Sequence, residues 1–237
     1  MLLSGCSVYN QTYVHIEPHE QESGSDESEV VSARDYDQLL DALINMVTHG
    51  REGGLIYISD YDQAMLEQSM RTAEDYIRKV HPIGAYSVED ITYEIGARQG
   101  LTAVAFTVTY NHNRSVLPKI RQVANMATAQ TLLSTALNQC DSSLVLYVED
   151  YITTDCLQFV RDYALEHPEQ VMEVPQITET HYPETGNRRV IEFQITYQNS
   201  RDTLQNMQKY VQPVFSSASL YVSGESEEQT KFEMLYS

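Results

Sequence analysis

The residues of this chain best suited to nucleophilic chemistry are two cysteines and two histidines in its second half. A thiol at a helix N-terminus ionises more readily than usual, and a histidine within hydrogen-bond reach can take its proton. Cys156 lies near the start of a predicted helix, and His167 and His181 follow it. Cys140 is the second thiol of this region. These residues support the hypothesis of a cysteine hydrolase or transferase.

The spacing of these residues argues against that hypothesis. Cys156 and His167 are eleven residues apart on one predicted helix, which separates them by roughly 16 Å along its axis. His81 and His167 each precede a proline, and this position favours a role in ending a helix. We therefore predict no catalytic residue.

The chain has 3 cysteines, too few for a disulfide framework. Cys140 and Cys156 flank the predicted strand Leu144–Val148 and could meet. The sequence leaves open whether they form a disulfide or are two small buried apolar residues, and we favour the second interpretation.

Acidic residues are the other candidates for chemistry, as ligands for a cation. Imidazoles and carboxylates alternate between His15 and Glu20, but no rigid element is predicted there to orient them. Asp60 and Asp150 each precede a predicted helix, where an aspartate usually acts as a cap. We predict no metal site and no cofactor. Binding of a small ligand or cation by the acidic surface is the alternative function.

The charge of the chain excludes one class of partner. Its formal net charge is −19, from 34 acidic and 15 basic residues. Such a surface repels nucleic acid phosphates, so we predict no nucleic-acid partner. No apolar run approaches the roughly 18 residues that a membrane-spanning helix needs.

The first residues contain a motif for attachment to a membrane. Leu3-Ser4-Gly5-Cys6 resembles the lipobox of bacterial lipoproteins, in which the bond before the cysteine is cut and the cysteine is lipidated. Only five residues precede Cys6, whereas a signal peptide has a basic segment and an apolar stretch of roughly 7–15 residues. Residues 17–30 are acidic and polar, which predicts a disordered linker over 1–33. The resemblance implies an extracytoplasmic protein anchored to the bacterial cell membrane through Cys6.

The sequence between residues 34 and 199 contains an internal repeat. Phe106–Tyr110 matches Phe193–Tyr197 at a distance of 87 residues, and shorter matches occur in the same order on either side. Self-similarity of this kind predicts a duplicated structural unit. We assign repeat 1 to residues 34–112 and repeat 2 to residues 113–199.

Each repeat is predicted to contain a helix, a strand, a helix and a two-stranded hairpin. Apolar residues recur at helical spacing from Tyr36 to Val47, and the second repeat is expected to begin its first helix at Ile120. The last strand alternates, with Glu192, Gln194 and Thr196 on its polar face. This pattern indicates an α+β fold with small antiparallel sheets covered by helices on one face. The polar face is the predicted contact surface.

Residues 200–237 are predicted to start a partial third unit. A helix begins at Arg201 and contains Pro213. Residues 226–229 read as a capping box, and the apolar stripe that follows is short, so the C-terminal helix looks truncated.

The lipobox, the acidic linker, the Asp-Tyr pairs at Asp60 and Asp150 and the capped segment at 226–236 together resemble one known family. Transglutaminase-like lipoproteins of Gram-positive bacteria carry tandem helix–strand repeats before a catalytic domain with a papain-type fold. The resemblance implies that this chain is the accessory N-terminal part of such a protein. That family's catalytic cysteine lies in a glycine-rich turn, and neither Cys140 nor Cys156 has one.

The sequence therefore predicts a non-catalytic interaction or spacer module. Its partners are expected to be the membrane, through the lipid on Cys6, and a protein or cell-wall component. The two alternatives remain a small-ligand or cation-binding lipoprotein and a cysteine enzyme.

Overall fold

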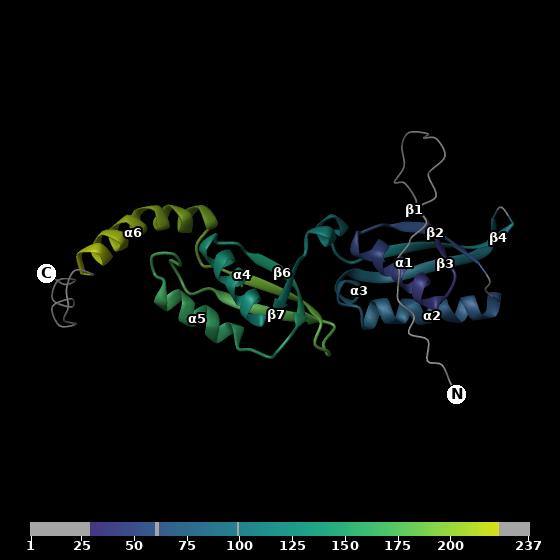
Figure 1. The fold of residues 1–237 in the computed structure, drawn as a ribbon. Helices are drawn as coiled ribbons and strands as arrows, with labels where there is room; N and C mark the ends of the chain where they lie inside the picture. The colour runs from purple at the N-terminus through teal and green to yellow at the C-terminus, as the bar shows by residue number, and fades with distance from the viewer. Residues whose placement is uncertain (1–28, 60–61, 99, 223–237) are drawn as a thin grey trace, which may run out of the picture. The chain divides into compact units, whose positions relative to one another are not determined.

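The computed structural model describes residues 29–59, 62–98 and 100–222. The chain divides into two compact units, Met1–Lys119 and Ile120–Ser237, and each contains a four-stranded sheet with helices (Figure 1). The α+β class and the two sheet–helix units predicted from the sequence are confirmed. The elements are β1 (Glu29–Ala33), α1 (Tyr36–Thr48), β2 (Gly53–Ile58), α2 (Gln63–Lys79), α3 (Pro82–Ser87), β3 (Val88–Arg98), β4 (Leu101–Tyr110), the 3-10 helix η1 (Arg114–Lys119), β5 (Arg121–Asn125), α4 (Met126–Asn138), β6 (Ser143–Asp150), α5 (Cys156–Glu166), β7 (Gln176–Tyr182), β8 (Arg189–Thr196) and α6 (Arg201–Val222).

Both sheets have the same topology, and both are mixed. The strand orders are β1-β2-β4-β3 and β5-β6-β8-β7. The first two strands of each unit pair in parallel, and the other pairs are antiparallel. A parallel pair needs a crossover, which α1 and α4 supply. The predicted antiparallel pairing is confirmed for β2, β4 and β3 and for β6, β8 and β7. Each sheet also has a parallel pair, which the prediction missed because it lacked the short strand that opens each unit.

The same omission misplaced the start of the first helix of the second repeat. The segment from Ile120 was expected to be helical, but Arg121–Asn125 forms β5 and pairs with β6. Val123 is buried on this strand, and a single apolar residue fits a strand as well as a helix. The helix begins only after Asn125, whose side chain accepts a hydrogen bond from the Thr128 backbone N–H. Asp35 caps α1 in the same way, by accepting from Gln38.

Each core lies between the sheet and its helices. Ile56 and Val104 are strand partners in unit 1, and Leu146 and Ile191 are the equivalent partners in unit 2. All four are 0% exposed. Burying such a side chain contributes about 1.5–3 kcal/mol, so these layers are the main source of stability.

The first helix of each unit ends in the same hydrogen-bonded turn. Gly50 and Cys140 follow the C-caps of α1 and α4 with positive φ angles of 68° and 55°. The backbone N–H of Gly50 donates to Val47, and that of Cys140 donates to Leu137. Left-handed residues at this position are usually glycine because a Cβ is strained there. Cys140 thus occupies a glycine position.

The units differ after their second helix. His81-Pro82 ends α2, as predicted, but Pro82 also begins the short helix α3. The Nδ1 atom of His81 accepts a hydrogen bond from the Gly84 N–H at 3.2 Å. A Cβ on Gly84 would lie 2.2 Å from the carbonyl oxygen of Ile77, so glycine permits α3 to lie against α2. His167 instead forms the C-cap of α5, and the next element among the described residues is the strand β7.

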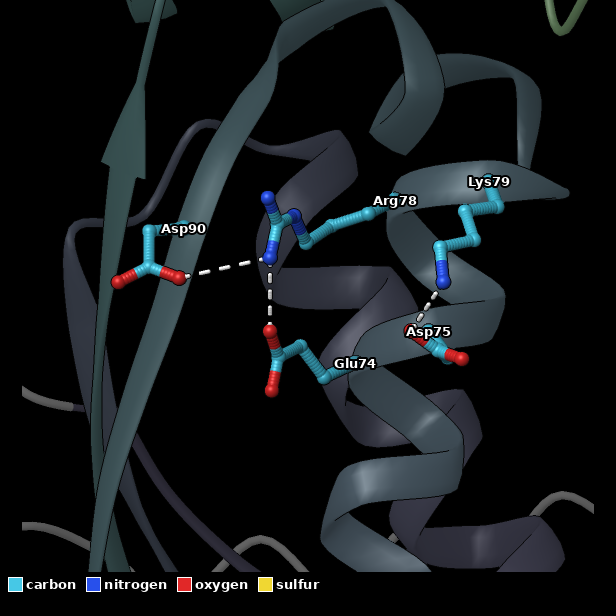
Figure 2. Close-up of polar contacts among 5 residues, drawn as sticks. All are labelled: Glu74, Asp75, Arg78, Lys79 and Asp90. Carbon is cyan, nitrogen blue, oxygen red and sulfur yellow. Dashed lines mark hydrogen bonds and ion pairs between the residues drawn. The ribbon is translucent and has the colours of Figure 1, made fainter.

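Ion pairs link α2 to the sheet in unit 1. Figure 2 shows the Arg78 guanidinium between Glu74 on the same helix, at 2.8 Å, and Asp90 on β3, at 3.5 Å. Lys79 pairs with Asp75 one turn back on the exposed side. These partly exposed pairs orient the surface of α2 and contribute little to stability.

The helix expected from Arg201 is confirmed as α6, with Pro213 inside it. The predicted capping box at 226–229, the truncated-looking helix and the lipobox lie outside the described residues, as does Asp60. No helix among the described residues combines the length and apolar character needed to cross a membrane.

Candidate functional site

The most varied group of reactive side chains lies in unit 2, where the β7–β8 hairpin meets the start of α5. We call it the hairpin cluster; its members are Tyr151, Cys156, Glu179, His181 and Arg189. Because Glu179 pairs with Phe193 and His181 with Ile191, both side chains lie on the helix-covered face of the sheet. Their side chains are only 19% and 23% exposed.

The two ring nitrogens of His181 both have partners. Nε2 lies 2.5 Å from Oε1 of Glu179, and Nδ1 lies 3.1 Å from Nη1 of Arg189. A guanidinium can only donate, so Nδ1 is the acceptor and Nε2–H donates to the carboxylate. This imidazole is therefore held between an anion and a cation.

Arg189 connects the cluster to the loops around it. Its guanidinium carbon lies 4.2 Å from the centre of the Tyr151 ring, and its Nε donates to the carbonyl of Gly186 at 2.7 Å. The Tyr151 ring also meets the edge of His181, with centroids 4.9 Å apart. A cation over an aromatic face contributes about 0.5–1 kcal/mol at a partly exposed site.

Cys156 lies at the first position of α5 and is 2% exposed. The pKa of its thiol is raised to about 11, mainly by burial and also by the carboxylates of Glu179 and Asp155, against a lowering by the Thr154 hydroxyl. These effects outweigh the helix dipole, which alone would favour the thiolate. Thr154 Oγ1 lies 3.5 Å from the sulfur.

The structure brings Cys156 and His181 into one cluster but leaves His167 at the opposite end of α5. The separation of Cys156 from His167 predicted from the helix is confirmed. His181 has no free nitrogen to take the thiol proton, because Glu179 and Arg189 occupy both. As arranged, the cluster supports packing of the hairpin against α5 and not nucleophilic attack.

The hairpin cluster is specific to the second unit. The strand register makes Tyr93 and Ile95 the counterparts of Glu179 and His181, since they pair with Phe106 and Val104. Thus unit 2 has the ionisable pair Glu179 and His181 where unit 1 has Tyr93 and Ile95. Glu179 and Arg189 were missed in the sequence, and the comparison of the two copies at these positions was the signal that could have found them.

A second polar group lies at the C-terminal end of α4. The Tyr197 hydroxyl is buried and has no hydrogen-bond partner in the part of the chain that the structure describes. Arg201 and Asp141 pair nearby, with Nη2 and Oδ1 2.9 Å apart. In unit 1 the equivalent Tyr110 donates to the carbonyl of Arg51 at 2.7 Å. The second unit therefore contains an unsatisfied hydroxyl where the first has a hydrogen bond.

The thiols of Cys140 and Cys156 are both free and buried. Burial is the main effect on the Cys140 thiol, and it raises the pKa of that group. The arrangement in this structure is the unpaired one that we favoured.

The predicted contact face lies on the side of the sheet that faces away from the core. Glu192, Gln194 and Thr196 alternate along β8 with the buried Ile191 and Phe193. Gln194 and Thr196 are exposed, and Glu192 is half-buried.

Aromatic residues flank this polar strip. Tyr147 and Tyr182 lie on either side of Val190, as its strand partners on β6 and β7. Burial raises the pKa of the Tyr182 hydroxyl, and the nearby Glu192 carboxylate raises it further. The face thus combines two tyrosines, an acid and an amide on a rigid sheet.

Within the described ranges, no three histidine, cysteine or acidic side chains are grouped as metal ligands. Asp150 lies exposed at the end of β6. Cys6 falls outside these ranges. Comparison of the chain with protein-family models, with curated proteins and with solved structures finds no match.

Proposed function

We propose that this protein is a non-catalytic interaction module that binds its partner through the face of the second sheet opposite α4 and α5. The carrying observation is the pair of half-buried tyrosines, Tyr147 and Tyr182, which flank the fully buried Val190 beside Glu192 and Gln194 on that face. Tyrosines on a rigid surface provide contact area with little loss of side-chain entropy, and the acid and the amide provide directional hydrogen bonds.

We also propose that the protein is anchored outside the cell. The lipobox-like residues ending in Cys6 support attachment to the outer face of the bacterial membrane, with the acidic linker as a spacer. The module then acts as the accessory N-terminal part of a transglutaminase-like lipoprotein and contacts a protein or cell-wall component. The repeats support this proposal through their tandem arrangement, which suits a spacer.

The contact face is tested by site-specific photo-crosslinking in cells that produce the protein with a complete signal peptide. A photoreactive amino acid at Gln194 should give a discrete high-mass adduct. The same amino acid at Arg161, an exposed position on α5, is the matched control and should give none. Equal adduct formation at both positions, or none at either, would refute the proposed surface.

The tether is tested by Cys6→Ala in the same expression system. We expect the protein to move from the membrane fraction to the soluble extracellular fraction, because a lipidated cysteine is the only anchor that the proposal contains. A Cys140→Ala variant controls for loss of a thiol elsewhere. If Cys6→Ala stays in the membrane fraction, the anchoring proposal is wrong, whatever the crosslinking shows.

A further inference from the structure

The C-terminal helix α6 continues an apolar face beyond the point where it is anchored to unit 2. Leu204 is 1% exposed, and Nε2 of Gln208 donates to the carbonyl of Asn138 at 2.9 Å. Figure 1 shows that the later turns of α6 extend past α4 and α5. The first two turns of the helix are therefore its attachment to the unit.

Large apolar side chains are exposed on these later turns. The exposed fractions are 41% for Met207, 79% for Tyr210, 66% for Val214 and 44% for Phe215. Val211 is half-buried between them. Their spacing of three and four residues places them on one broad stripe of the helix. Clustered exposure of this kind marks an interaction surface, unlike a single exposed apolar residue.

Charge separates this stripe from the rest of the molecule. The chain carries a net charge of −19, but Lys209 is the only charged residue between Thr203 and Val222. Two copies approaching through most other surfaces would bring acidic groups together, as would one copy approaching an anionic lipid surface. Interfaces are depleted of charge at their centre and enriched in tyrosine, phenylalanine and methionine. The α6 stripe meets both conditions.

The stripe is also complementary to itself. Val211 lies midway between Met207 and Phe215, so an antiparallel pair of α6 helices places Met207 of one copy against Phe215 of the other. We propose that α6 is the interface of a two-fold symmetric homodimer, in which the α6 stripe of a second copy covers this one. This inference goes beyond the proposed function and does not depend on the tether.

The size of the stripe sets the expected affinity. From Met207 to Phe215 a helix rises about 12 Å, so each copy contributes on the order of a few hundred Å². Stable complexes bury roughly 1,200–2,000 Å² in total. The dimer is therefore weak, and its dissociation constant lies in the range of tens to hundreds of micromolar, roughly.

Sedimentation velocity of the full chain, from about 1 µM to about 1 mM, tests this proposal over the range in which such interfaces dissociate. We expect a monomer–dimer equilibrium. Val214→Glu should weaken association by about tenfold or more, because it places a charge in the apolar contact. Met65→Glu is the matched control, since Met65 is 56% exposed on α2, a helix of the other unit. It should leave association unchanged.

Disulfide trapping tests the geometry. In a Cys6→Ser background, Val211→Cys should form an intermolecular disulfide rapidly, because the two-fold axis passes beside this residue. Ser216→Cys, an exposed position on the opposite side of α6, should not. A monomer over the whole concentration range, or equal effects of Val214→Glu and Met65→Glu, would overturn the proposal. A third result would also overturn the proposal: the protein is a monomer, and Val214→Glu lowers its helix content. The stripe would then be covered by the C-terminal segment of the same chain.

Discussion

The N-cap of α3 makes the stability of unit 1 sensitive to pH through one histidine. Nδ1 of His81 accepts the Gly84 N–H and can do so only while that nitrogen is unprotonated. Burial lowers the pKa of His81 from 6.5 to about 4. Replacing His81 with Asn keeps a hydrogen-bond acceptor at the cap and removes the titration, because asparagine is among the preferred N-cap residues.

The sign of the effect follows from proton linkage. The His81 pKa is lower in the folded state, so the unfolded chain takes up the proton first as the pH falls. The contribution to stability is complete above pH 6.5, declines as the pH falls toward 4, and is constant below that. A pKa shift of this size changes the free energy of unfolding by about 3 kcal/mol at most. The ring keeps some contact with solvent, so we expect about 2 kcal/mol.

The assay is urea unfolding of the full chain at several pH values, read by pulsed hydrogen exchange in peptides from α2 and α3. Between neutral pH and pH 4, the free energy of unfolding should fall by about 2 kcal/mol more in the wild type than in His81→Asn, because the other groups titrate equally in both proteins. His167→Asn is the control, because His167 does not cap a following helix. Equal pH dependence of wild type and His81→Asn would refute the reasoning, as would an NMR titration that places the His81 pKa near 6.5.

Two further pairs of substitutions each include a control, and both are measured by urea unfolding with unit-resolved hydrogen exchange. Tyr197→Phe should stabilise unit 2 by about 1 kcal/mol, because it removes a buried hydroxyl without a partner, whereas Tyr110→Phe should destabilise unit 1 by about 1 kcal/mol. A loss of stability in both would contradict this. Gly84→Ala should destabilise unit 1 by about 2–3 kcal/mol through its contact with Ile77, while Gly96→Ala, with nothing within 4 Å, should change stability by less than about 0.5 kcal/mol. Similar effects of the two alanines would show that α2 and α3 are not closely packed.

The helices and hairpins were predictable because their signals are local. Apolar residues at helical spacing placed α1 and α6, and alternation placed β4 and β8. The opening strands β1 and β5 were missed because a strand of 5 residues acquires its identity from pairing with β2 or β6. Each partner residue lies 25 positions further along the chain, as Gly54 does from Glu29 and Leu146 from Arg121, so the pairing leaves no periodic pattern. The helix α3, with 6 residues, is similarly too short to show a helical period.

The candidate sites were harder to predict for a related reason. Glu179 and His181 are polar residues at alternating positions of an edge strand, a pattern that normally indicates the solvent face. The structure directs them toward α5 instead, where they bind each other and His181 also contacts Arg189 and Tyr151. A single polar pattern cannot distinguish a wet face from an internal ionic cluster. Only the partners, which come from separate segments, make that distinction.

The differences between the two units also explain where α6 can bind. In unit 1, α3 lies at the ends of α1 and α2, and Gly84 permits its close approach. Unit 2 has no helix at the equivalent place among its described residues. Instead the Tyr163 hydroxyl donates to Gln170 at 2.9 Å, and the Asn138 amide donates to Tyr163 at 3.0 Å. Gln208 of α6 donates to the carbonyls of both Asn138 and Gln170. The carbonyls of Asn138 and Gln170 thus serve as acceptors for the first turns of α6, and its later turns carry the exposed apolar stripe.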